Sequence, residues 1–189
     1  MKLIHLAVAG LMAISGFVGS AVAAEDDFLT IQLKDGPVVI ELLPKSAPQH
    51  VARLKELASK GEFDNVAFHR VIEGFMAQTG DVQFGDMEDG FQPDRAGTGG
   101  SSLPDLPAEF SNIPFERGTV GMARAQDPNS ANSQFFIMFA DGGFLNGQYT
   151  VVGKVVAGMD HVDKIKRGDG ANGEVSNPDR MVKVTVGRK

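Results

Sequence analysis

Apolar and polar residues alternate near the start of the chain, on both sides of a tight turn. Phe28–Leu33 and Pro37–Leu42 place apolar side chains at roughly every second position, and Asp35-Gly36 lies between them. Alternation with a period of two is typical of a strand with one buried face, and an Asp-Gly pair between two such runs is typical of a hairpin turn. The pattern therefore predicts a β-hairpin over residues 28–42.

The spacing of apolar residues changes after the hairpin to that of a helix. Ser46-Ala-Pro-Gln49 resembles a helix start, with Ser46 as the N-cap, Pro48 in the first turn and Gln49 at the capping-box position. Gly61 is expected to end the helix. One apolar stripe runs along it, formed by Val51, Leu54, Leu57 and Ala58.

Short apolar runs separated by Gly, Asn, Asp and Pro make up most of the remaining chain. The strand candidates are residues 66–72, 75–78, 119–123, 134–139, 151–156 and 181–186. Met159, Val162 and Ile165 have helical spacing and indicate a second short helix. This set predicts a mainly β protein, a closed eight-stranded antiparallel barrel capped by two α-helices. A β-sandwich would also accommodate the strands but has less use for the helices.

Gln83–Phe115 is rich in glycine and proline and shows little periodicity. A loop of this length inside a compact domain is usually functional, which here suggests a surface groove. The segment Asp81–Gly90, which overlaps the start of this loop, carries several acidic residues whose spacing does not match a calcium-binding loop. We expect that acidic segment to be solvated.

The first 24 residues differ from the rest of the chain. Lys2 is followed by the nearly uncharged, mostly apolar run Leu3–Phe17, then by small residues ending in Ala21-Val-Ala23, and then by the acidic Glu25–Asp27. This layout is that of a secretory signal peptide cleaved after Ala23 or Ala24, which leaves residues 25–189 as one domain. An uncleaved membrane anchor is the alternative, because Leu3–Ala24 is just long enough to span a bilayer.

Composition and motifs exclude several kinds of chemistry. The chain has no cysteine, which removes disulfides, thiolate metal sites and cysteine nucleophiles. A formal charge of −6 without a basic run argues against nucleic-acid binding. No nucleophile elbow or zinc-protease motif occurs. Gly168–Gly173 has the G-x-G-x-x-G spacing of a dinucleotide-binding loop, but it follows a helix and precedes a strand, so it is interpreted as a turn.

Three segments combine apolar and polar residues in an unusual way. Val66–Ile72 is an apolar strand run that contains His69 and Arg70, and a guanidinium in such a strand must be paired or used at a rim. Phe75–Asp81 and Asn132–Ile137 each interleave aromatic rings with carboxamides. Any single phenylalanine here is most simply a core residue.

Taken together, these segments closely resemble the signature segments of the cyclophilin family of peptidyl-prolyl cis–trans isomerases. The resemblance is carried in order and spacing from about Phe28 to the C-terminus. Its motifs are Phe68–Ile72, Gly74–Gln78 with Gly80-Asp81, Gly97–Gly100, Gly118–Ala123, Ser133–Ile137, Phe144-Leu145 and Val152–Val155. It implies a cyclophilin-like barrel and isomerase activity.

The resemblance also implies a role for each matching residue. Arg70 corresponds to the catalytic arginine, and Gln78 and Gln134 correspond to the polar groups that hold the substrate backbone and orient Arg70. The proline pocket would be walled by Phe75, Met76, Phe136 and Leu145. Ala123 and Arg124 would line the groove for residues preceding proline, and Phe144 and Tyr149 its far rim. The chain departs from the common family pattern at Phe144, Tyr149 and Arg124, where Trp, His and Asn are usual.

Rotation about an X–Pro bond breaks no covalent bond, so the implied reaction needs no cofactor, metal or nucleophile. The expected partners are proline-containing unfolded or folding polypeptides, with no nucleic acid and no stable membrane insertion once the signal is cleaved. The protein is expected to be a monomer in the periplasm or secreted.

Two alternatives stay open: a proline-peptide-binding module without turnover, and a hydrolase that uses His69 with a nearby serine. For His69 itself, a structural, hydrogen-bonded role is expected.

Overall fold

The computed structural model describes residues 27–187, so the predicted signal peptide lies outside the described residues. The strands are β1 (Phe28–Leu33), β2 (Gly36–Leu42), β3 (Arg70–Ile72), β4 (Met76–Thr79), β5 (Thr119–Met122), β6 (Phe135–Met138), β7 (Val151–Ala157) and β8 (Lys183–Gly187). The helices are α1 (Pro48–Ser59), α2 (Met159–Val162) and the 3₁₀ turn η1 (Gly143–Leu145). None of the helices in residues 27–187 is long and apolar enough to cross a membrane.

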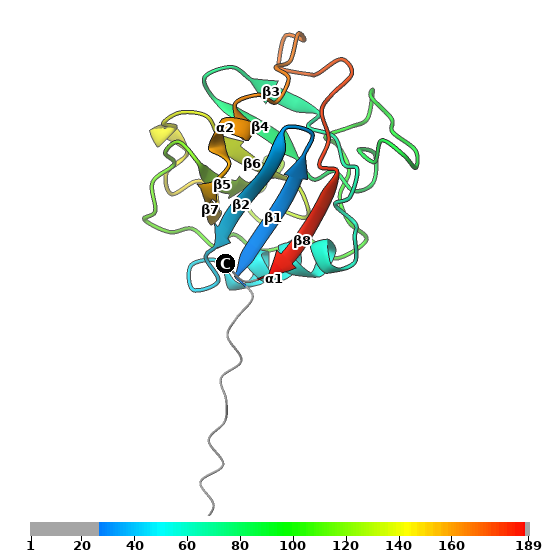
Figure 1. Ribbon diagram of the computed structural model, residues 1–189. Coiled ribbons are helices and arrows are strands. Elements are labelled where there is room, and N and C mark those ends of the chain that lie inside the picture. The colour runs from blue at the N-terminus through cyan, green and yellow to red at the C-terminus, as the bar shows by residue number, and fades with distance from the viewer. Residues whose placement is uncertain (1–26, 188–189) are drawn as a thin grey trace, which may run out of the picture.

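The eight strands form one antiparallel sheet in the order β3-β4-β6-β5-β7-β2-β1-β8. The hairpin predicted over residues 28–42 is confirmed as β1 and β2. A single sheet excludes the β-sandwich. The prediction of a closed barrel is wrong, however, because no ladder joins the end strands β3 and β8, and the sheet is a curled half-barrel (Figure 1).

The barrel does not close because the predicted strand 66–72 forms a ladder only over its last three residues. The residues before Arg70 hydrogen bond to several separate segments. Ala67 N–H donates to Gly85 O at 2.9 Å, and Phe68 N–H donates to Asp179 O at 2.8 Å. Such scattered bonds satisfy the buried backbone without a continuous ladder. Within residues 27–187, the isolated bridge of Ala67 with Arg180 joins this segment to the chain just before β8 without extending into a ladder.

Helix α1 ends as predicted but begins differently. At its C-terminus Gly61 has φ +76°, and the N–H groups of Gly61 and Glu62 donate to Ala58 O and Leu57 O, which is a Schellman motif. At its N-terminus the cap residue is Ala47, which has no capping side chain, so the prediction of Ser46 as N-cap with Gln49 in a capping box is wrong.

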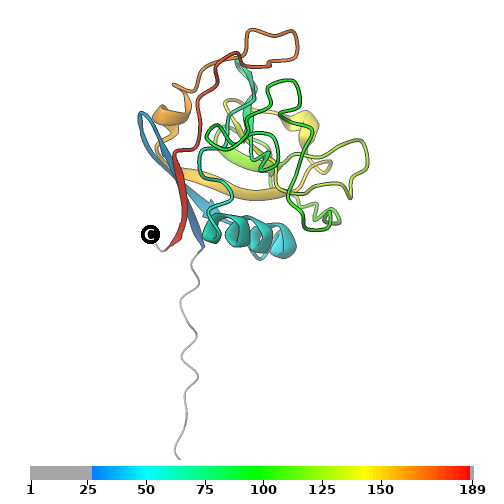
Figure 2. The same ribbon diagram turned by 90° about the vertical axis from the view of Figure 1, so that its right-hand side faces the viewer.

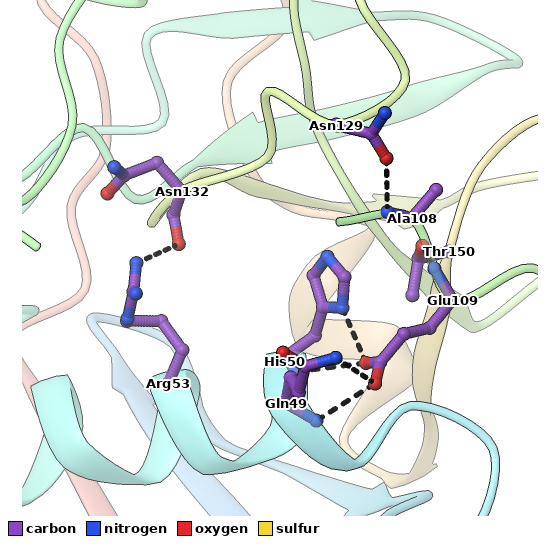
Figure 3. A network of polar contacts seen from close by, with 8 residues as sticks. All are labelled: Gln49, His50, Arg53, Ala108, Glu109, Asn129, Asn132 and Thr150. Atoms are coloured by element: carbon purple, nitrogen blue, oxygen red, sulfur yellow. Dashed lines mark hydrogen bonds and ion pairs between the residues drawn. The ribbon is translucent and has the colours of Figure 1, made fainter. Parts of the chain in front are cut away.

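The carboxylate of Glu109, in the long loop, caps this helix instead. It accepts the backbone N–H groups of Gln49 and His50 at 3.1 Å each, and His50 Nδ1 lies 2.6 Å from Glu109 Oε2. Figure 3 shows these contacts, together with Arg53 reaching the main-chain oxygen of Asn132. The negative charge also suits the positive end of the helix dipole. The loop is thereby fastened to α1.

The two helices lie near opposite ends of the β1–β2 hairpin. Helix α1 crosses the lower end of the sheet in both views (Figures 1 and 2). Helix α2 lies beside the turn of the hairpin, where His161 Nδ1 is 3.0 Å from Pro37 O. It is a single turn and ends before Ile165, so it is shorter than the apolar spacing predicted.

Buried residues form two clusters on the two faces of the sheet. The larger one contains Phe135, Leu54 and Ile137, and the smaller one contains Met76 and Phe136. Phe135 therefore faces the larger cluster, and its neighbour Phe136 points to the opposite face because side chains alternate along a strand. Gln83–Phe115 contains neither helix nor strand, as the sequence indicated.

Candidate functional site

One row of side chains crosses four strands on the face of the smaller cluster. In the ladders Arg70 pairs with Gln78, Gln78 with Phe136, and Phe136 with Gly121. Residues that are paired directly across antiparallel strands project to the same side of a sheet. Strand pairing therefore places the guanidinium, a carboxamide and an aromatic ring side by side.

Gly121 leaves room for the rings that form the floor of the site. A Cβ at this position would lie 2.5 Å from Phe115 and 2.6 Å from Phe136. The two rings stack with their centroids 5.7 Å apart, and the Tyr149 ring meets Phe136 edge-on at 6.0 Å. The absent side chain of Gly121 thus allows three aromatic rings to pack into a rigid base.

A cavity of about 380 Å³ opens above this base. Ten of the eleven predicted site residues line it: Arg70, Phe75, Met76, Gln78, Ala123, Arg124, Phe136, Phe144, Leu145 and Tyr149. Met76 and Phe136 are almost completely buried, whereas Phe144 is 66% exposed and lies against Phe75 with a centroid distance of 5.5 Å. The inner wall is therefore packed and the outer rim is open to solvent.

A continuous chain of hydrogen bonds starts at Arg70 and crosses the site. Arg70 Nη1 donates to Gln78 Oε1 at 3.3 Å, Gln78 Nε2 donates to Gln134 Oε1 at 2.9 Å, and Gln134 Nε2 donates to Gly99 O at 2.7 Å. Each carboxamide accepts with its oxygen and donates with its nitrogen, so the direction of the chain is fixed from Arg70 to Gly99.

The far end of that chain is anchored by a buried carboxylate. Asp81 is fully buried, and its oxygens accept the N–H groups of Gly97 at 2.7 Å and Gly99 at 3.0 Å. The same carboxylate also accepts the N–H groups of Gln83 and Phe84. The expectation of a solvated acidic loop is therefore wrong for Asp81, because four backbone N–H groups compensate for its burial.

Arg124 is held rigidly at the border of this cavity. Its Nη1 donates to Ala125 O and Gln126 O, and its Nη2 donates to Gln148 O at 3.0 Å. The guanidinium also lies 4.4 Å from the centre of the Tyr149 ring, a cation–π arrangement.

A second cavity of about 520 Å³ lies next to the first and shares Gln78, Ala123 and Arg124 with it. The eleventh predicted residue, Gln134, lines this one. Its remaining walls are mostly main chain and polar side chains: Gly97, Thr98, Gly99, Gly100, Ser101, Asp105, Ala125, Ser130 and Asn132. Sequence reasoning assigned none of these a role, although Gly97–Gly100 had been singled out as a matching motif.

The sequence motifs did not indicate two further residues that lie next to the site. Gln148 lines the first cavity and donates from Nε2 to Phe144 O at 2.8 Å. Asn172 reaches Arg70 from the other side, and its main-chain oxygen accepts a hydrogen bond from Arg70 Nε at 2.8 Å. A carbonyl contact of this kind leaves no side-chain signature in a sequence.

His69 lies behind the site and is not equipped for hydrolysis. Its ring is buried, and within residues 27–187 neither ring nitrogen has a partner in good hydrogen-bond geometry, although the backbone of Ala67 and the side chain of Gln134 lie close enough to raise its pKa slightly. Burial lowers the pKa of His69 to about 4, and the nearby Asp81 carboxylate opposes the shift only in part. No serine among the described residues bonds to this ring, so they form no His–Ser pair there. Among the described residues, no three His, Asp or Glu side chains gather to hold a metal ion.

Comparison with known proteins gives matches over the whole folded region. Residues 28–186 match the family described as "Cyclophilin type peptidyl-prolyl cis-trans isomerase/CLD". A probable peptidyl-prolyl cis-trans isomerase of Brucella suis is 64% identical over 184 residues, which cover 96% of this chain and 94% of that protein. A peptidyl-prolyl cis-trans isomerase of Helicobacter pylori is 37% identical over 150 residues, covering 77% and 84% of the two chains.

A solved structure has the same fold. The crystal structure of the cyclophilin AquaCyp293 from Hirschia baltica matches with a TM-score of 0.71 and 25% identity. The match covers 85% of this chain and 74% of that one.

Proposed function

We propose that Arg70 is the catalytic residue of this protein, since the chain belongs to the cyclophilin-type peptidyl-prolyl cis–trans isomerase family and is an isomerase of X–Pro peptide bonds. The observation that carries the proposal is the position of Arg70 at the edge of the apolar cavity. Its Nε and Nη1 are occupied by Asn172 O and Gln78 Oε1, and none of residues 27–187 bonds to its Nη2. Three of its five N–H groups, two on Nη2 and one on Nη1, are thus left for a substrate.

The barrier to the reaction comes from amide resonance and is about 18–20 kcal/mol. As the bond twists, the imide nitrogen becomes pyramidal and gains a lone pair. A guanidinium N–H can donate to this lone pair in the transition state, an interaction that is much weaker in the planar ground state. Differential binding of this kind accelerates a reaction, and a gain of about 10⁵ requires about 7 kcal/mol.

The other site residues would supply position and orientation. Phe75, Met76, Phe136 and Leu145 are proposed to grip the proline ring, while Gln78 orients Arg70 as catalytic partner. Gln134 is proposed to hold the substrate backbone together with Gln78. Ala123 and Arg124 would contact residues before the proline, and Phe144 and Tyr149 would form the outer rim.

A protease-coupled assay on a proline tetrapeptide tests the assignment. Arg70→Ala is expected to lower kcat/KM by about 10²–10³, the usual cost of removing a transition-state donor. Its melting temperature should stay close to that of the wild type, because Arg70 is only half-buried and sits at the rim. Wild-type activity in a folded Arg70→Ala protein would contradict the proposal. Equally negligible activity in both proteins would favour the binding module without turnover.

We further propose that the substrates are unfolded or folding polypeptides that contain proline. Prolyl isomerisation is slow enough to limit many folding reactions, so an isomerase with an open groove suits this role. The chain is proposed to act as a monomer and, with its formal charge of −6, without nucleic acid.

Export to the periplasm or the medium is proposed from residues 1–24, which have the layout of a signal peptide. The mature protein would then consist of residues 25–189, or of 24–189 if cleavage follows Ala23. N-terminal sequencing of the purified protein should begin at Ala24 or Glu25, and recovery of an intact Met1 from the membrane fraction would argue for an uncleaved anchor instead.

A further inference from the structure

The glycine-rich loop Gly168–Gly173, whose spacing imitates a dinucleotide-binding motif, lies directly behind Arg70. Its Asn172 oxygen accepts from Arg70 Nε at 2.8 Å, whereas the bond from Arg70 Nη1 to Gln78 is 3.3 Å long. Shorter charge-assisted hydrogen bonds are the stronger ones. Of the two hydrogen bonds that hold the Arg70 guanidinium, the one to the loop is therefore the stronger.

Both ends of this loop are fastened to the strand that carries Arg70. Val71 N–H donates to Gly173 O at 2.7 Å, and Gly168 N–H donates to Val71 O at 2.8 Å. Gly173 has φ +86°, and a Cβ there would collide with the Ile72 side chain, so only glycine fits. The loop and β3 thus move as one unit.

Within the loop, Glu174 fixes the orientation of Asn172. Glu174 Oε2 accepts Asn172 N–H and Glu174 Oε1 accepts Asn172 Nδ2, both at 3.0 Å. The main-chain oxygen of Glu174 accepts the N–H groups of Asp169 and Gly170 at 3.1 Å each. Hydrogen bonds from Asn172 lower the pKa of Glu174, so the side chain is ionised at neutral pH. Glu174 itself lines neither of the two cavities.

We propose that Glu174 is a positioning residue for the isomerase reaction: through Asn172 it holds the Arg70 guanidinium in the orientation that donates to the imide nitrogen. The inference rests on the proposed catalytic role of Arg70. Because the bond from Arg70 strengthens only as the substrate twists, a loosened guanidinium lowers kcat and leaves substrate binding nearly unchanged.

Glu174→Ala tests this, with Glu56→Ala as the matched control. Glu56 is also an exposed glutamate, but it pairs with Lys60 on α1 and lines neither cavity. We expect kcat to fall about tenfold in Glu174→Ala with KM within about twofold of wild type, since small misplacements of a catalytic group are costly. Glu56→Ala should match the wild type. Glu174→Gln keeps one acceptor oxygen for Asn172 in place of two, so it should recover part of the loss.

A spectroscopic readout separates positioning from a general structural effect. In ¹⁵N-labelled protein the Arg70 Nε–H signal should be protected from solvent exchange, and Glu174→Ala should remove that protection while the Val71 amide stays protected. Combined with Arg70→Ala, Glu174→Ala should cause no further loss of activity.

The possible failures are distinguishable. Wild-type activity in Arg70→Ala would overturn the catalytic role of Arg70 and this inference with it. If Arg70→Ala is inactive but Glu174→Ala keeps wild-type kcat and a protected Nε–H, only the positioning role is wrong. Equal losses in Glu174→Ala and Glu174→Gln, or a further tenfold loss when Glu174→Ala is added to Arg70→Ala, would also overturn the positioning role.

Discussion

The two cavities that meet at Gln78, Ala123 and Arg124 are built in different ways. The one of about 380 Å³ is walled on its inner side by packed apolar side chains that belong to a buried cluster. The one of about 520 Å³ is walled mainly by loop backbone and by polar side chains such as Asp105 and Asn132. The first is shaped by core packing and the second by hydrogen bonds.

This difference suggests a division of labour within one groove. A proline ring is the same in every substrate, so a rigid apolar pocket can serve all of them. The residue before the proline varies in size and charge, and a wall of backbone groups and charges can discriminate among such residues. We therefore expect changes in the apolar cavity to affect all substrates equally and changes in the polar cavity to alter preference.

The largest effect is expected for Phe136→Ala. Phe136 is 5% exposed and stacks on Phe115, and removing such a ring costs about 3–5 kcal/mol of stability. Activity should fall by the same factor for every tetrapeptide, because the floor of the shared pocket is lost. Urea unfolding and assays on a peptide series measure the two effects.

Phe144→Ala is the control for the stability part of this prediction. Phe144 is 66% exposed, so its replacement should change the free energy of unfolding by no more than about 0.5 kcal/mol. A loss of activity in Phe136→Ala that depends strongly on the residue before proline would contradict the proposed division.

The apolar cavity was largely predictable from the sequence, whereas the supports of the polar one were not. Strand alternation accounts for the burial of Phe135 in the larger cluster and of Phe136 in the smaller one on the other face. The family resemblance supplied the cavity residues, ten of which line a single cavity. Both kinds of reasoning depend on side-chain type at a fixed spacing.

The polar supports depend on partners that are remote in sequence and often on backbone atoms. Glu109 caps a helix that begins 61 residues earlier, at Pro48, so a search for a local capping box selected Ser46 instead. Asp81 looked like part of a solvated loop because its four backbone donors carry no side-chain signal. The closed barrel was overpredicted for the same reason, since the bonds of Ala67 and Phe68 go to unrelated segments.

A second prediction concerns acid sensitivity on the polar side. The His69 ring lies against Gly97, whose main chain lines the polar cavity, and burial lowers the pKa of His69 from 6.5 to about 4. Between these values the unfolded chain binds a proton that the native protein does not, so stability rises with pH there and is lost as the pH falls. The slope reaches at most 1.36 kcal/mol per pH unit and is about half of that near pH 6.5, so about 2 kcal/mol should disappear between about pH 6.5 and 4.5.

Urea unfolding at several pH values, with His69→Leu for comparison, checks this. The variant has no titratable group at this site, so its stability should depend much less on pH in the same range. Burial raises the pKa of Glu109, but hydrogen bonds from His50 and Gln49 outweigh this effect and hold it below the ordinary 4.5. The contribution of Glu109 to folding stability is present above pH 4.5 and is lost only at lower pH, outside the range in which His69 acts. Identical pH slopes for wild type and His69→Leu would refute the assignment.

The smallest effect, and the most direct test of the two-cavity comparison, is expected for Arg124→Ala. Three main-chain oxygens and the Tyr149 ring hold the Arg124 guanidinium where the cavities meet. A fixed positive charge there should favour a glutamate over a lysine before the proline by about 1 kcal/mol at the dielectric of a protein surface. Removing it should lower the ratio of kcat/KM for Glu-Pro to that for Lys-Pro about fivefold.

Two further variants decide whether charge or shape causes that change. Arg124→Lys keeps the charge and should keep most of the ratio, although it loses the planar fit to Tyr149. Asp105→Asn removes the negative charge in the polar cavity and should shift the ratio in the opposite direction. If Arg124→Ala instead weakens both peptides equally, as Phe136→Ala is expected to do, the two cavities act as one pocket. The residue before proline must then be read by Gln134 and the Gly97–Gly100 backbone, whose hydrogen bonds do not depend on the charge of the substrate side chain.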